Sequence, residues 1–426
     1  MKKKIKNIIY SIVLILLILP FIQEQLDIFK INPLKGSFKK LEEPEFSFST
    51  YYSGEFQNKY NDYLEQNIGF RPFFIRVNNQ IAFSVYDTAL ASWVIIGKRN
   101  YLYEKNYITA YLGKDFIGKE KIDNKIEKVK FLQDTLQKIG VKLVLIFAPG
   151  KASFYPEYIP DKYNPSEKTI SNYDYYTKRC IEEGINHINF SEYFIQLKDT
   201  SRYLLVPKCG IHWSLYGVAI AIDSLKKYME KSQNIKIPDI IWDTIEVTKD
   251  LRDTDYDIAD GMNLLFTIPH QKMAYPKLLF EKNPDKIKPN VITIADSYYW
   301  NIFGAGMATQ LFGNNSFWYY NKMAHNTEYS EPKKVDELNL KKEIESQDFI
   351  FLLASEINLH KFAFGFIDKA FELYSTDKEI AYYEDLIRSS PKWIAKIAKK
   401  AKEKNISLDE MIRQDAIWMK NNKGGK

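Results

Sequence analysis

The sequence predicts an α/β fold, in which a mainly parallel sheet carries helices on both faces, between an N-terminal membrane anchor and a C-terminal helical tail. Short apolar runs alternate with amphipathic helical patterns through the middle of the chain, which is typical of parallel sheets covered on both sides. An uncharged apolar run follows a basic N-terminus, and the last residues are rich in lysine.

The composition is that of a globular protein, with 426 residues of which 45% are hydrophobic and 27% charged. These values exclude wholesale disorder and fibrous repeats. The net charge of +6 is concentrated at the ends: residues 1–22 hold four lysines and no acid, and residues 391–426 hold ten basic and four acidic residues. The body between them is slightly acidic, so we expect no nucleic-acid binding.

The two cysteines, Cys180 and Cys209, are too few for a disulfide scaffold or a cysteine-rich zinc module. The chain has five histidines, which disfavours a multi-histidine metal site. We therefore expect neither a metal nor a cofactor.

The apolar run Asn7–Ile22 follows Lys2, Lys3, Lys4 and Lys6. As a helix it would be about 24 Å long, short of the roughly 30 Å bilayer core, but Lys6 can extend toward the headgroups. No small-x-small cleavage site follows. We expect an uncleaved signal anchor over residues 1–22, with the body exported. A cleaved signal peptide and a buried core helix are the alternatives.

Residues 23–110 are expected to form a lead-in to the main domain. Residues 27–50 have the composition of a linker, and residues 51–80 show a helical amphipathic pattern. A hairpin is predicted from Val94–Gly97 and the segment 100–103, with its turn at Lys98–Asn100.

The α/β domain is expected over residues 111–375. Its clearest helix spans 119–140, where six apolar residues from Ile122 to Ile139 recur at steps of three and four. Further elements are predicted in chain order: strand 141–148, helix 173–183, strand 185–190, helix 214–229, and strands 291–295, 317–320 and 349–354.

The tail, residues 376–426, is expected to be helical. Ser390 and Pro391 have the types preferred at a helix start, and Ser407 with Glu410 forms a capping-box pattern. Its basic face is expected to be solvated, with binding to acidic lipids or an anionic polymer as the alternative.

A serine follows the predicted strand 291–295, in the segment Asp296-Ser297. Ligands of open α/β sheets bind at the carboxyl ends of the strands, which places Ser297 at such a mouth. Backbone N–H groups at the start of the next helix would lie beside it and could hold an oxyanion. The alternative is that Asp296 and Ser297 only cap a helix.

A histidine, His212, precedes Trp213 and the helix predicted from Ser214. A helix N-terminus disfavours the imidazolium, so His212 would be neutral near pH 7 and able to accept a proton. Alone it would be structural, but with Ser297 it can form a nucleophile and its general base.

The order of these segments resembles the alginate O-acetyltransferase family of exported, SGNH-hydrolase-like proteins, which O-acetylate cell-envelope polysaccharides. The similarity covers roughly residues 50–370 and rests on VIIGKRNYLY, LIFAPGKASFYPEYIP, GIHWSLYG and ADSYYW. The resemblance implies an SGNH-like (flavodoxin-like) fold, Ser297 as the acyl-accepting nucleophile and His212 as its base.

One position departs from the family pattern. That pattern reads Asp-x-His-Trp, and Gly210 stands where the acid orients the histidine. Three outcomes follow: a slow Ser–His dyad, a replacement acid from elsewhere, or a site that binds without catalysing. The nearest replacement acids lie in the segment 250–260, with Asp255 and Asp257 as the candidates.

Other residues are weaker candidates. Lys151 follows strand 141–148, where a substrate-facing loop would begin, and Asn358 follows strand 349–354 and could donate to an oxyanion. Asp296 and Trp213 flank the two main residues. Cys209 is a rival nucleophile, although a small buried residue is the simpler interpretation.

We therefore expect an acetyltransferase that forms acyl-Ser297 and passes the acetyl group to a sugar hydroxyl. A carbohydrate acetylesterase and a non-catalytic glycan-binding or assembly subunit are the alternatives. By resemblance, the partners are a polysaccharide acceptor and a membrane-bound O-acyltransferase that supplies the acetyl group. The expected location is the bacterial envelope, anchored in the inner membrane with the main domain in the periplasm.

Overall fold

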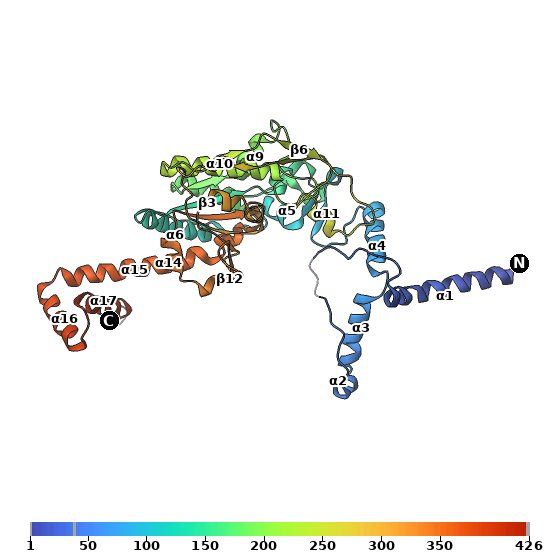
Figure 1. Ribbon diagram of the computed structural model, residues 1–426, viewed down its shortest axis with the longest axis horizontal. Coiled ribbons are helices and arrows are strands. Elements are labelled where there is room, and N and C mark those ends of the chain that lie inside the picture. The colour runs from blue at the N-terminus through green and yellow to red at the C-terminus, as the bar shows by residue number, and fades with distance from the viewer. Residues whose placement is uncertain (1, 37–39, 423–426) are drawn as a thin grey trace.

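A seven-stranded sheet lies at the centre of the computed structural model, which describes residues 2–36 and 40–422 (Figure 1). The strand order is β12-β11-β10-β9-β13-β3-β4. The strands are β3 Lys142–Ala148, β4 His187–Asn189, β9 Val291–Ala295, β10 Asn315–Tyr319, β11 Met323–Asn326, β12 Lys333–Lys334 and β13 Phe349–Ser355. The strands β10, β9, β13, β3 and β4 each pair in parallel with the next in this order. At one edge of the sheet, β11 pairs antiparallel with both β10 and β12. The predicted mainly parallel α/β sheet is confirmed.

Helices cover both faces of this sheet because the central strands are apolar on both sides. Along β3, Val144 and Ile146 enter one hydrophobic core, and the alternate residues Leu143 and Leu145 enter the other. The first core packs against α9 (Phe190–Leu197) and α10 (Leu215–Gln233), and the second against α6 (Lys119–Gln137), α8 (Asn172–Glu182) and the start of α15 (Phe366–Arg388).

The hairpin of β1 (Val94–Ile96) and β2 (Leu102–Glu104) forms as the sequence predicts, with its turn at Lys98–Asn100. Leu102 and Tyr103 are fully buried in the first core. Helix α5 (Lys105–Tyr111) continues from the hairpin. The hydrophobic core therefore begins at residue 94, ahead of the expected domain start at 111.

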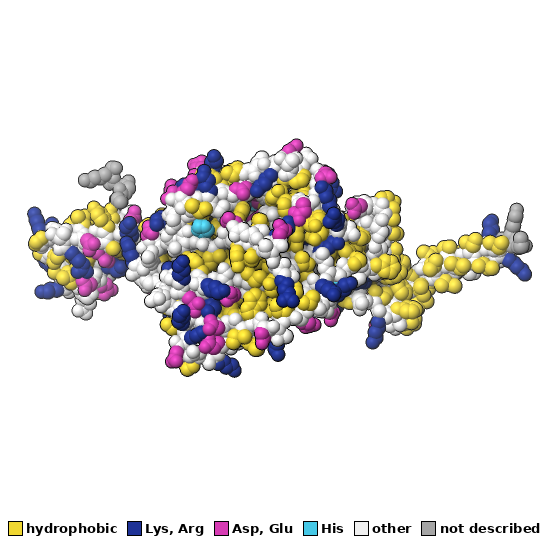
Figure 2. Space-filling view, turned by 90° about the horizontal axis from the view of Figure 1, so that it is seen from above, with side chains coloured by type: hydrophobic (Ala, Val, Ile, Leu, Met, Phe, Trp, Pro, Cys, Tyr) yellow, Lys and Arg dark blue, Asp and Glu magenta, His cyan; other side chains and the backbone are white. Residues whose placement is uncertain are grey.

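The N-terminal helix α1 spans Lys2–Leu26, so it extends beyond both ends of the apolar run Asn7–Ile22 and four residues past the expected end of the anchor at residue 22. The stretch Lys4–Leu26 has 23 residues, and its most apolar 18-residue window has a mean hydropathy of 2.4. The stretch measures about 34 Å. It projects from the body as an apolar rod (Figure 2). Among the described residues it is the one helix that is long and apolar enough to cross a membrane.

The predicted helical stretch 51–80 is split into three helices: α2 (Phe48–Tyr52), α3 (Glu55–Asn67) and α4 (Arg71–Tyr86). Gly54 has a φ of 80° at the first break. The second break precedes Pro72 in the first turn of α4, where a proline is tolerated, whereas in a continuous helix it would remove a hydrogen bond.

Several predicted boundaries are wrong by a few residues. Helix α6 ends at Gln137, so Ile139 lies outside it and is half exposed. Strand β4 stops at Asn189 because that side chain caps helix α9, a helix that was not predicted. The short pairs β5–β8 (Ile240–Ile241, Leu279–Phe280) and β6–β7 (Ile245–Thr248, Met273–Pro276) were also not predicted.

The tail is helical, as expected. Helix α15 leaves the sheet and packs against α16 (Pro391–Lys404) and α17 (Leu408–Asn421) around a third core that includes Ile387 and Ile412. Ser407 Oγ accepts a hydrogen bond from the Glu410 N–H, whereas Ser390 stands at the cap position of α16 without a side-chain bond. The tail and α1 lie at opposite ends of the molecule (Figure 1).

Candidate active site

Ser297 lies just beyond the carboxyl end of β9, on the short helical turn Ser297–Tyr299. Asp296 caps this turn, since its Oδ1 accepts a hydrogen bond from the Tyr298 N–H at 3.1 Å. His212 precedes helix α10, whose own cap is Ser214. Each side chain thus occupies the end of an ordered element.

In the structure, the side chains of Ser297, His212 and Asp257 contact one another in series. Ser297 Oγ lies 3.0 Å from His212 Nε2, and His212 Nδ1 lies 3.2 Å from Asp257 Oδ2. The His212 side chain is only 11% exposed. Asp257 Oδ1 also accepts a hydrogen bond from the Ile211 N–H at 2.9 Å, which fixes the carboxylate beside the ring. This is the order of contacts in a nucleophile–base–acid triad.

Asp257 opens helix α11 (Asp257–Gly261), 45 residues after His212. Of the two candidate acids, it is the one that contacts the imidazole. Asp255 instead accepts a hydrogen bond from the Tyr275 hydroxyl at 2.7 Å and is 3% exposed. Burial raises the pKa of the Asp255 carboxyl to about 6, and the Tyr275 hydrogen bond opposes that shift.

Gly210 is glycine because the segment that leads to Asp257 fills the space beside it. A Cβ at position 210 would lie 2.1 Å from the Thr254 carbonyl oxygen and 2.8 Å from the carbonyl carbon of Asp255. An aspartate at 210 and the 254–257 segment therefore exclude each other sterically. The absence of an aspartate at position 210 and the contact of Asp257 with His212 therefore depend on the same local packing.

Asp296 and Asn358 belong to a buried network behind the serine. Asp296 Oδ2 accepts hydrogen bonds from the Ser355 N–H (2.8 Å), the Ser355 hydroxyl (2.7 Å) and Asn358 Nδ2 (2.8 Å). This network joins the end of β9 to the end of β13. The Asn358 amide, expected near an oxyanion, is engaged by Asp296 instead.

Fewer backbone N–H groups are free to hold an oxyanion than the sequence predicts. The Tyr298 N–H donates to the Asp296 carboxylate and the Tyr299 N–H to the Asp296 carbonyl. Within residues 2–36 and 40–422, the Ser297 N–H has no hydrogen-bond partner. It is therefore the backbone donor of this turn that stays available.

Lys151 is fully buried. Its side chain therefore does not face a substrate, contrary to the expectation from its place after strand β3. It begins the short helix α7 (Lys151–Phe154), and its Nζ donates to the carbonyl oxygens of Lys208, at 2.8 Å, and Gly210. The ammonium thus holds the segment that presents His212. Burial lowers the pKa of Lys151 to about 7, opposed by Cys209, Asp257 and Glu104.

The low pKa of Lys151 predicts a pH-dependent stability. Above pH 7 the folded chain binds fewer protons here than the unfolded chain, so this group's contribution to stability rises with pH from about 7 and levels off near the unfolded pKa. We expect the thermal midpoint to rise between pH 6.5 and 9 in the native chain. In Lys151→Met, the part of this rise in thermal midpoint that comes from Lys151 should be absent. An identical pH profile in both proteins would contradict the assignment.

Trp213 is buried and acts on the serine turn indirectly. Its Nε1 donates to the Tyr298 carbonyl at 3.2 Å, and its ring packs against Phe190 and Phe194.

Cys209, the rival nucleophile, is also buried. Burial raises the pKa of its thiol, which disfavours the nucleophilic thiolate.

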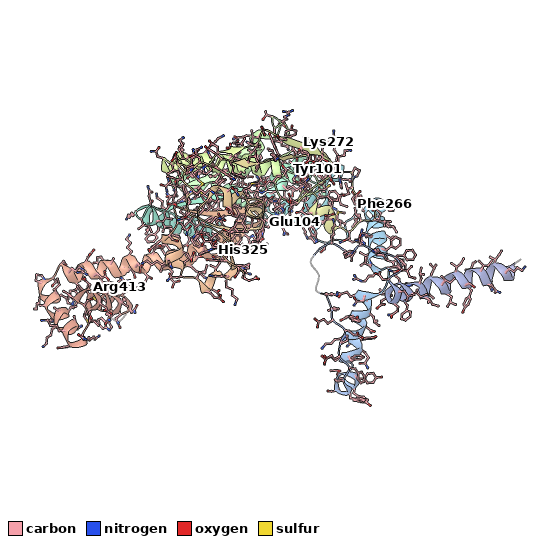
Figure 3. All side chains as sticks on the ribbon, viewed as in Figure 1. Tyr101, Glu104, Phe266, Lys272, His325 and Arg413 are labelled. Atoms are coloured by element: carbon pink, nitrogen blue, oxygen red, sulfur yellow. The ribbon has the colours of Figure 1, made fainter. Side chains whose placement is uncertain are left out.

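Two residues of the site were not singled out from the sequence. The Tyr298 hydroxyl donates to the Ile211 carbonyl at 2.9 Å, and its ring centroid lies 4.8 Å from that of His212. Glu104 lies at the end of β2 (Figure 3). Burial and the nearby Asp257 raise its pKa to about 7, and His212 and Lys151 oppose that shift. The one sequence feature that could have indicated Glu104 is its position directly after the predicted hairpin.

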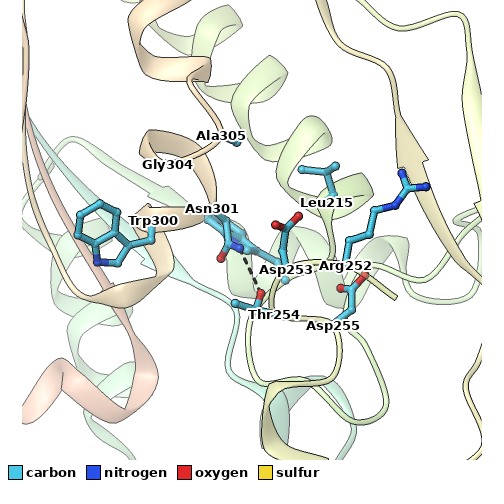
Figure 4. Close-up of a pocket in the computed structure, with 10 residues that line it drawn as sticks. Leu215, Arg252, Asp253, Thr254, Asp255, Trp300, Asn301, Gly304 and Ala305 are labelled. Carbon is cyan, nitrogen blue, oxygen red and sulfur yellow. Dashed lines mark hydrogen bonds between the residues drawn. The ribbon is translucent and has the colours of Figure 1, made fainter. Parts of the chain in front are cut away.

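A cavity of about 360 Å³ lies beside the serine turn (Figure 4). Its lining residues are Trp213, Leu215, Arg252, Asp253, Thr254, Asp255, Trp300, Asn301, Gly304 and Ala305. In the part of the chain that the structure describes, no three His, Cys, Asp or Glu side chains gather as metal ligands.

Residues 94–240 match the family model described as "SGNH hydrolase-like domain, acetyltransferase AlgX". The chain is 27% identical over 146 residues to a probable alginate O-acetylase AlgJ of Pseudomonas aeruginosa. That alignment covers 34% of this chain, and the chain spans about a third (35%) of the relative's length.

Three solved structures are similar at low identity. The O-acetyltransferase domain of Pseudomonas putida AlgJ is 15% identical, with 66% of this chain and 98% of that one covered and a TM-score of 0.41. Pseudomonas aeruginosa AlgX is 12% identical, with 65% and 67% covered and a TM-score of 0.42. Bacillus cereus PatB1 is 13% identical, with 64% and 99% covered and a TM-score of 0.41.

The family match includes Lys151, Gly210 and His212 and stops before Asp257 and Ser297. The resemblance to the alginate O-acetyltransferase family is thereby confirmed, in that residues 94–240 match the model of its SGNH hydrolase-like domain.

Proposed function

We propose that this chain is a cell-envelope polysaccharide O-acetyltransferase that works through an acyl-Ser297 intermediate. The observation that carries the proposal is the contact of Ser297 Oγ with His212 Nε2 at 3.0 Å, together with Asp257 on the opposite ring nitrogen. The match of residues 94–240 to an acetyltransferase family supports the same reaction class.

In the first half-reaction, Ser297 Oγ attacks the acetyl carbonyl of the donor while His212 Nε2 takes the hydroxyl proton. The carbonyl oxygen becomes an oxyanion, for which the free Ser297 N–H is a suitable donor. Collapse of this intermediate breaks the bond to the donor's leaving group, which receives the proton from His212. Asp257 stabilises the transient imidazolium through Nδ1–H.

In the second half-reaction a sugar hydroxyl attacks the acyl-serine, and His212 takes its proton. The bond between the acetyl carbon and Ser297 Oγ breaks, and the serine recovers the proton from the imidazolium. The products are the sugar acetate and the free enzyme. An esterase would use the same groups with water in place of the sugar.

The non-catalytic alternative rested on Gly210. Because Asp257 stands beside His212, the loss of the family acid no longer favours that alternative. Transfer and hydrolysis are separated by their products, since transfer yields acetylated glycan and hydrolysis yields free acetate.

The test is acyl labelling with an activated acetyl ester such as p-nitrophenyl acetate, read by mass spectrometry of the peptide that contains Ser297. We expect acetyl on Ser297 in the native chain and none in Ser297→Ala, with transfer to an added glycan. The matched control, Ser330→Ala, changes an exposed serine on another loop and should label normally. Absence of any acyl-enzyme would reject the proposal, and labelling that yields only acetate would favour the esterase.

We further propose that residues 1–22 anchor the chain in the inner membrane, with residues 23–93 as lead-in, the α/β body in the periplasm and residues 376–426 as a helical extension. The apolar rod α1 supports the anchor. A body outside the cytoplasm needs an acetyl donor delivered across the membrane, which suits a membrane-bound O-acyltransferase partner. Recovery of a chain without residues 2–26 in the membrane fraction would contradict the anchor.

A further inference from the structure

The turn between helices α3 and α4, residues 68–70, packs against the outer end of α1. A Cβ at Gly69 would lie 2.1 Å from the Pro20 carbonyl oxygen and 2.8 Å from both Gln23 Cβ and the Glu24 backbone nitrogen. A larger residue at position 69 would therefore separate the turn from the helix. The contact fixes the height of the turn along α1.

This height corresponds to the membrane boundary when α1 crosses the bilayer as proposed above. A helix needs about 20 residues to cross the hydrocarbon core. Counted from the residue after Lys6, the last lysine before the apolar run, such a span ends close to Leu26. Pro20 and Glu24 lie in its outer part. The turn 68–70 is thus at the depth where acyl chains meet the lipid headgroups.

Polar groups at this depth are shielded from their surroundings. The Gln23 side chain is only 6% exposed. Its Nε2 donates to the Phe29 carbonyl at 2.7 Å, and its Oε1 accepts from the Phe29 N–H at 3.0 Å. These amide and backbone groups therefore need no water, which is the condition for placing them in lipid.

Large apolar side chains at the same height are exposed. We call them the collar, which consists of Ile28, Phe29, Ile68, Phe70, Phe73 and Phe74. All except Phe70 are between 42% and 57% exposed. Phe70 joins them, with ring centroids 5.8 Å from Phe29 and 6.5 Å from Phe74. Figure 2 shows hydrophobic side chains gathered at the foot of the α1 rod. Exposed apolar clusters of this kind mark a surface that contacts something other than water.

The charged residues around the collar are mainly cations. Lys30, Arg71 and Arg76 belong to the collar segments, against the two acids Glu24 and Asp27. In the part of the chain that the structure describes, none of the three cations forms an ion pair with a carboxylate. The Arg76 guanidinium instead donates to two backbone carbonyl oxygens, at 2.8 and 2.7 Å. Such cations suit the phosphate groups of lipids.

We propose that the collar is a second membrane contact, which enters the leaflet on the body's side of the bilayer that α1 crosses. The proposal rests on the proposed anchor and not on the acyl-transfer reaction. Lipid is the occupant because the collar is continuous with α1 and lies at a depth where lipid surrounds that helix.

The contact would set the orientation of the body on the membrane. Helix α4 carries Phe73 and Phe74, and it also holds the segment that follows Asp257, because Asn79 Nδ2 donates to the Met262 carbonyl at 2.8 Å. The candidate active site is thereby held at a constant distance from the bilayer.

Fluorescence quenching of the full-length chain in nanodiscs tests the contact. A bimane is attached to one introduced cysteine, since Cys180 and Cys209 are buried and should stay unlabelled. The nanodiscs contain phosphatidylcholine with or without a nitroxide on the acyl chain near the headgroup. A bimane in Phe74→Cys should lose at least about half its fluorescence to the nitroxide. The control Tyr382→Cys, 62% exposed on α15 in the tail at the opposite end of the molecule (Figure 1), should lose none.

A reporter on α1 separates the collar from the anchor. Leu16 is 60% exposed in the middle of the apolar stretch, so Leu16→Cys should be quenched whenever α1 is in the bilayer. Quenching at residue 16 without quenching at residue 74 would overturn the collar and leave the anchor in place. Absence of quenching at both positions would reject both. Acyl labelling of Ser297 is independent of either result.

A charged variant shows whether the collar itself makes the contact. Phe74→Glu places a carboxylate among the collar rings, which lipid disfavours, and it should reduce quenching of a bimane in Phe29→Cys at least about twofold. The matched control Ile181→Glu changes an apolar residue that is 71% exposed on α8 and should leave the quenching unchanged. Equal quenching in Phe74→Glu would mean that α1 alone brings residue 29 to the lipid, which would overturn the second contact.

Discussion

Asp257→Asn is expected to lower turnover with an activated acetyl ester by about 10⁴-fold, as the loss of the orienting acid does in a serine triad. Asp257 contacts His212 Nδ1 and is held in place by the Ile211 N–H. An asparagine at this position can present its amide N–H₂ to the ring, which stabilises the wrong tautomer, and it leaves the imidazolium without a counter-charge. The rate of ester turnover at saturating substrate is the measurement.

The matched control is Asp260→Asn, which makes the same chemical change on the same helix. Asp260 pairs with Lys35 at a partly exposed position, so its loss should leave turnover within about twofold, because exposed pairs contribute little. A turnover of Asp257→Asn within tenfold of the native chain would mean that Ser297 and His212 act as a dyad.

Gly210→Asp, which restores the acid of the family pattern, is expected to inactivate the protein. The new Cβ would lie 2.1 Å from the Thr254 carbonyl oxygen, so the 254–257 segment must move and carry Asp257 away from His212. We expect a loss of at least a hundredfold in turnover, and a fall in stability of about 1–3 kcal/mol, typical of overpacked interiors. Ester turnover and the thermal midpoint measure the two effects.

Two further variants show whether the backbone is the cause. Gly210→Ala creates the same close contact without a carboxylate and should also lose activity. The double variant Gly210→Asp with Asp257→Asn moves the acid to the family position, and it should stay as inactive as Asp257→Asn alone. Full activity in the double variant would show that the 254–257 segment yields easily and that either position can hold the acid.

The positions of Ser297 and His212 followed from local sequence, because each stands at the end of an ordered element. Strand β9 and helix α10 are periodic or continuously apolar, and their ends meet at the carboxyl edge of the sheet. The acid could not be found in that way. The segment 250–260 holds several aspartates, and the one that reaches His212 is set by the Ile211 N–H and by contact with Gly210.

Lys151 shows a second limit of local reasoning. Its place after β3 predicted a substrate-facing side chain, and its backbone is where it was expected. The side chain direction is decided by the carbonyl groups of Lys208 and Gly210, which come from a segment almost sixty residues away. Tertiary contacts of this kind leave no periodic signal in the sequence.

The fold was predictable where elements are long and their apolar pattern is continuous. Strands β3, β9 and β13 are buried on both faces, and helix α6 presents a regular apolar stripe. The short helix α9 and the small antiparallel strand pairs were not predicted, because few residues define each of them. The lead-in was predicted as helical, but Gly54 and Pro72 divide it.

The close packing of Gly210 against Thr254 also bears on how relatives of this chain are recognised. Because an acid at 210 and the 254–257 segment compete for one volume, the two positions are coupled and would have to change together during divergence. A search that demands an aspartate two residues before the histidine would discard any chain built in this way. A glycine at that place, followed about 45 residues later by an aspartate that begins a helix, is the paired signature to search for.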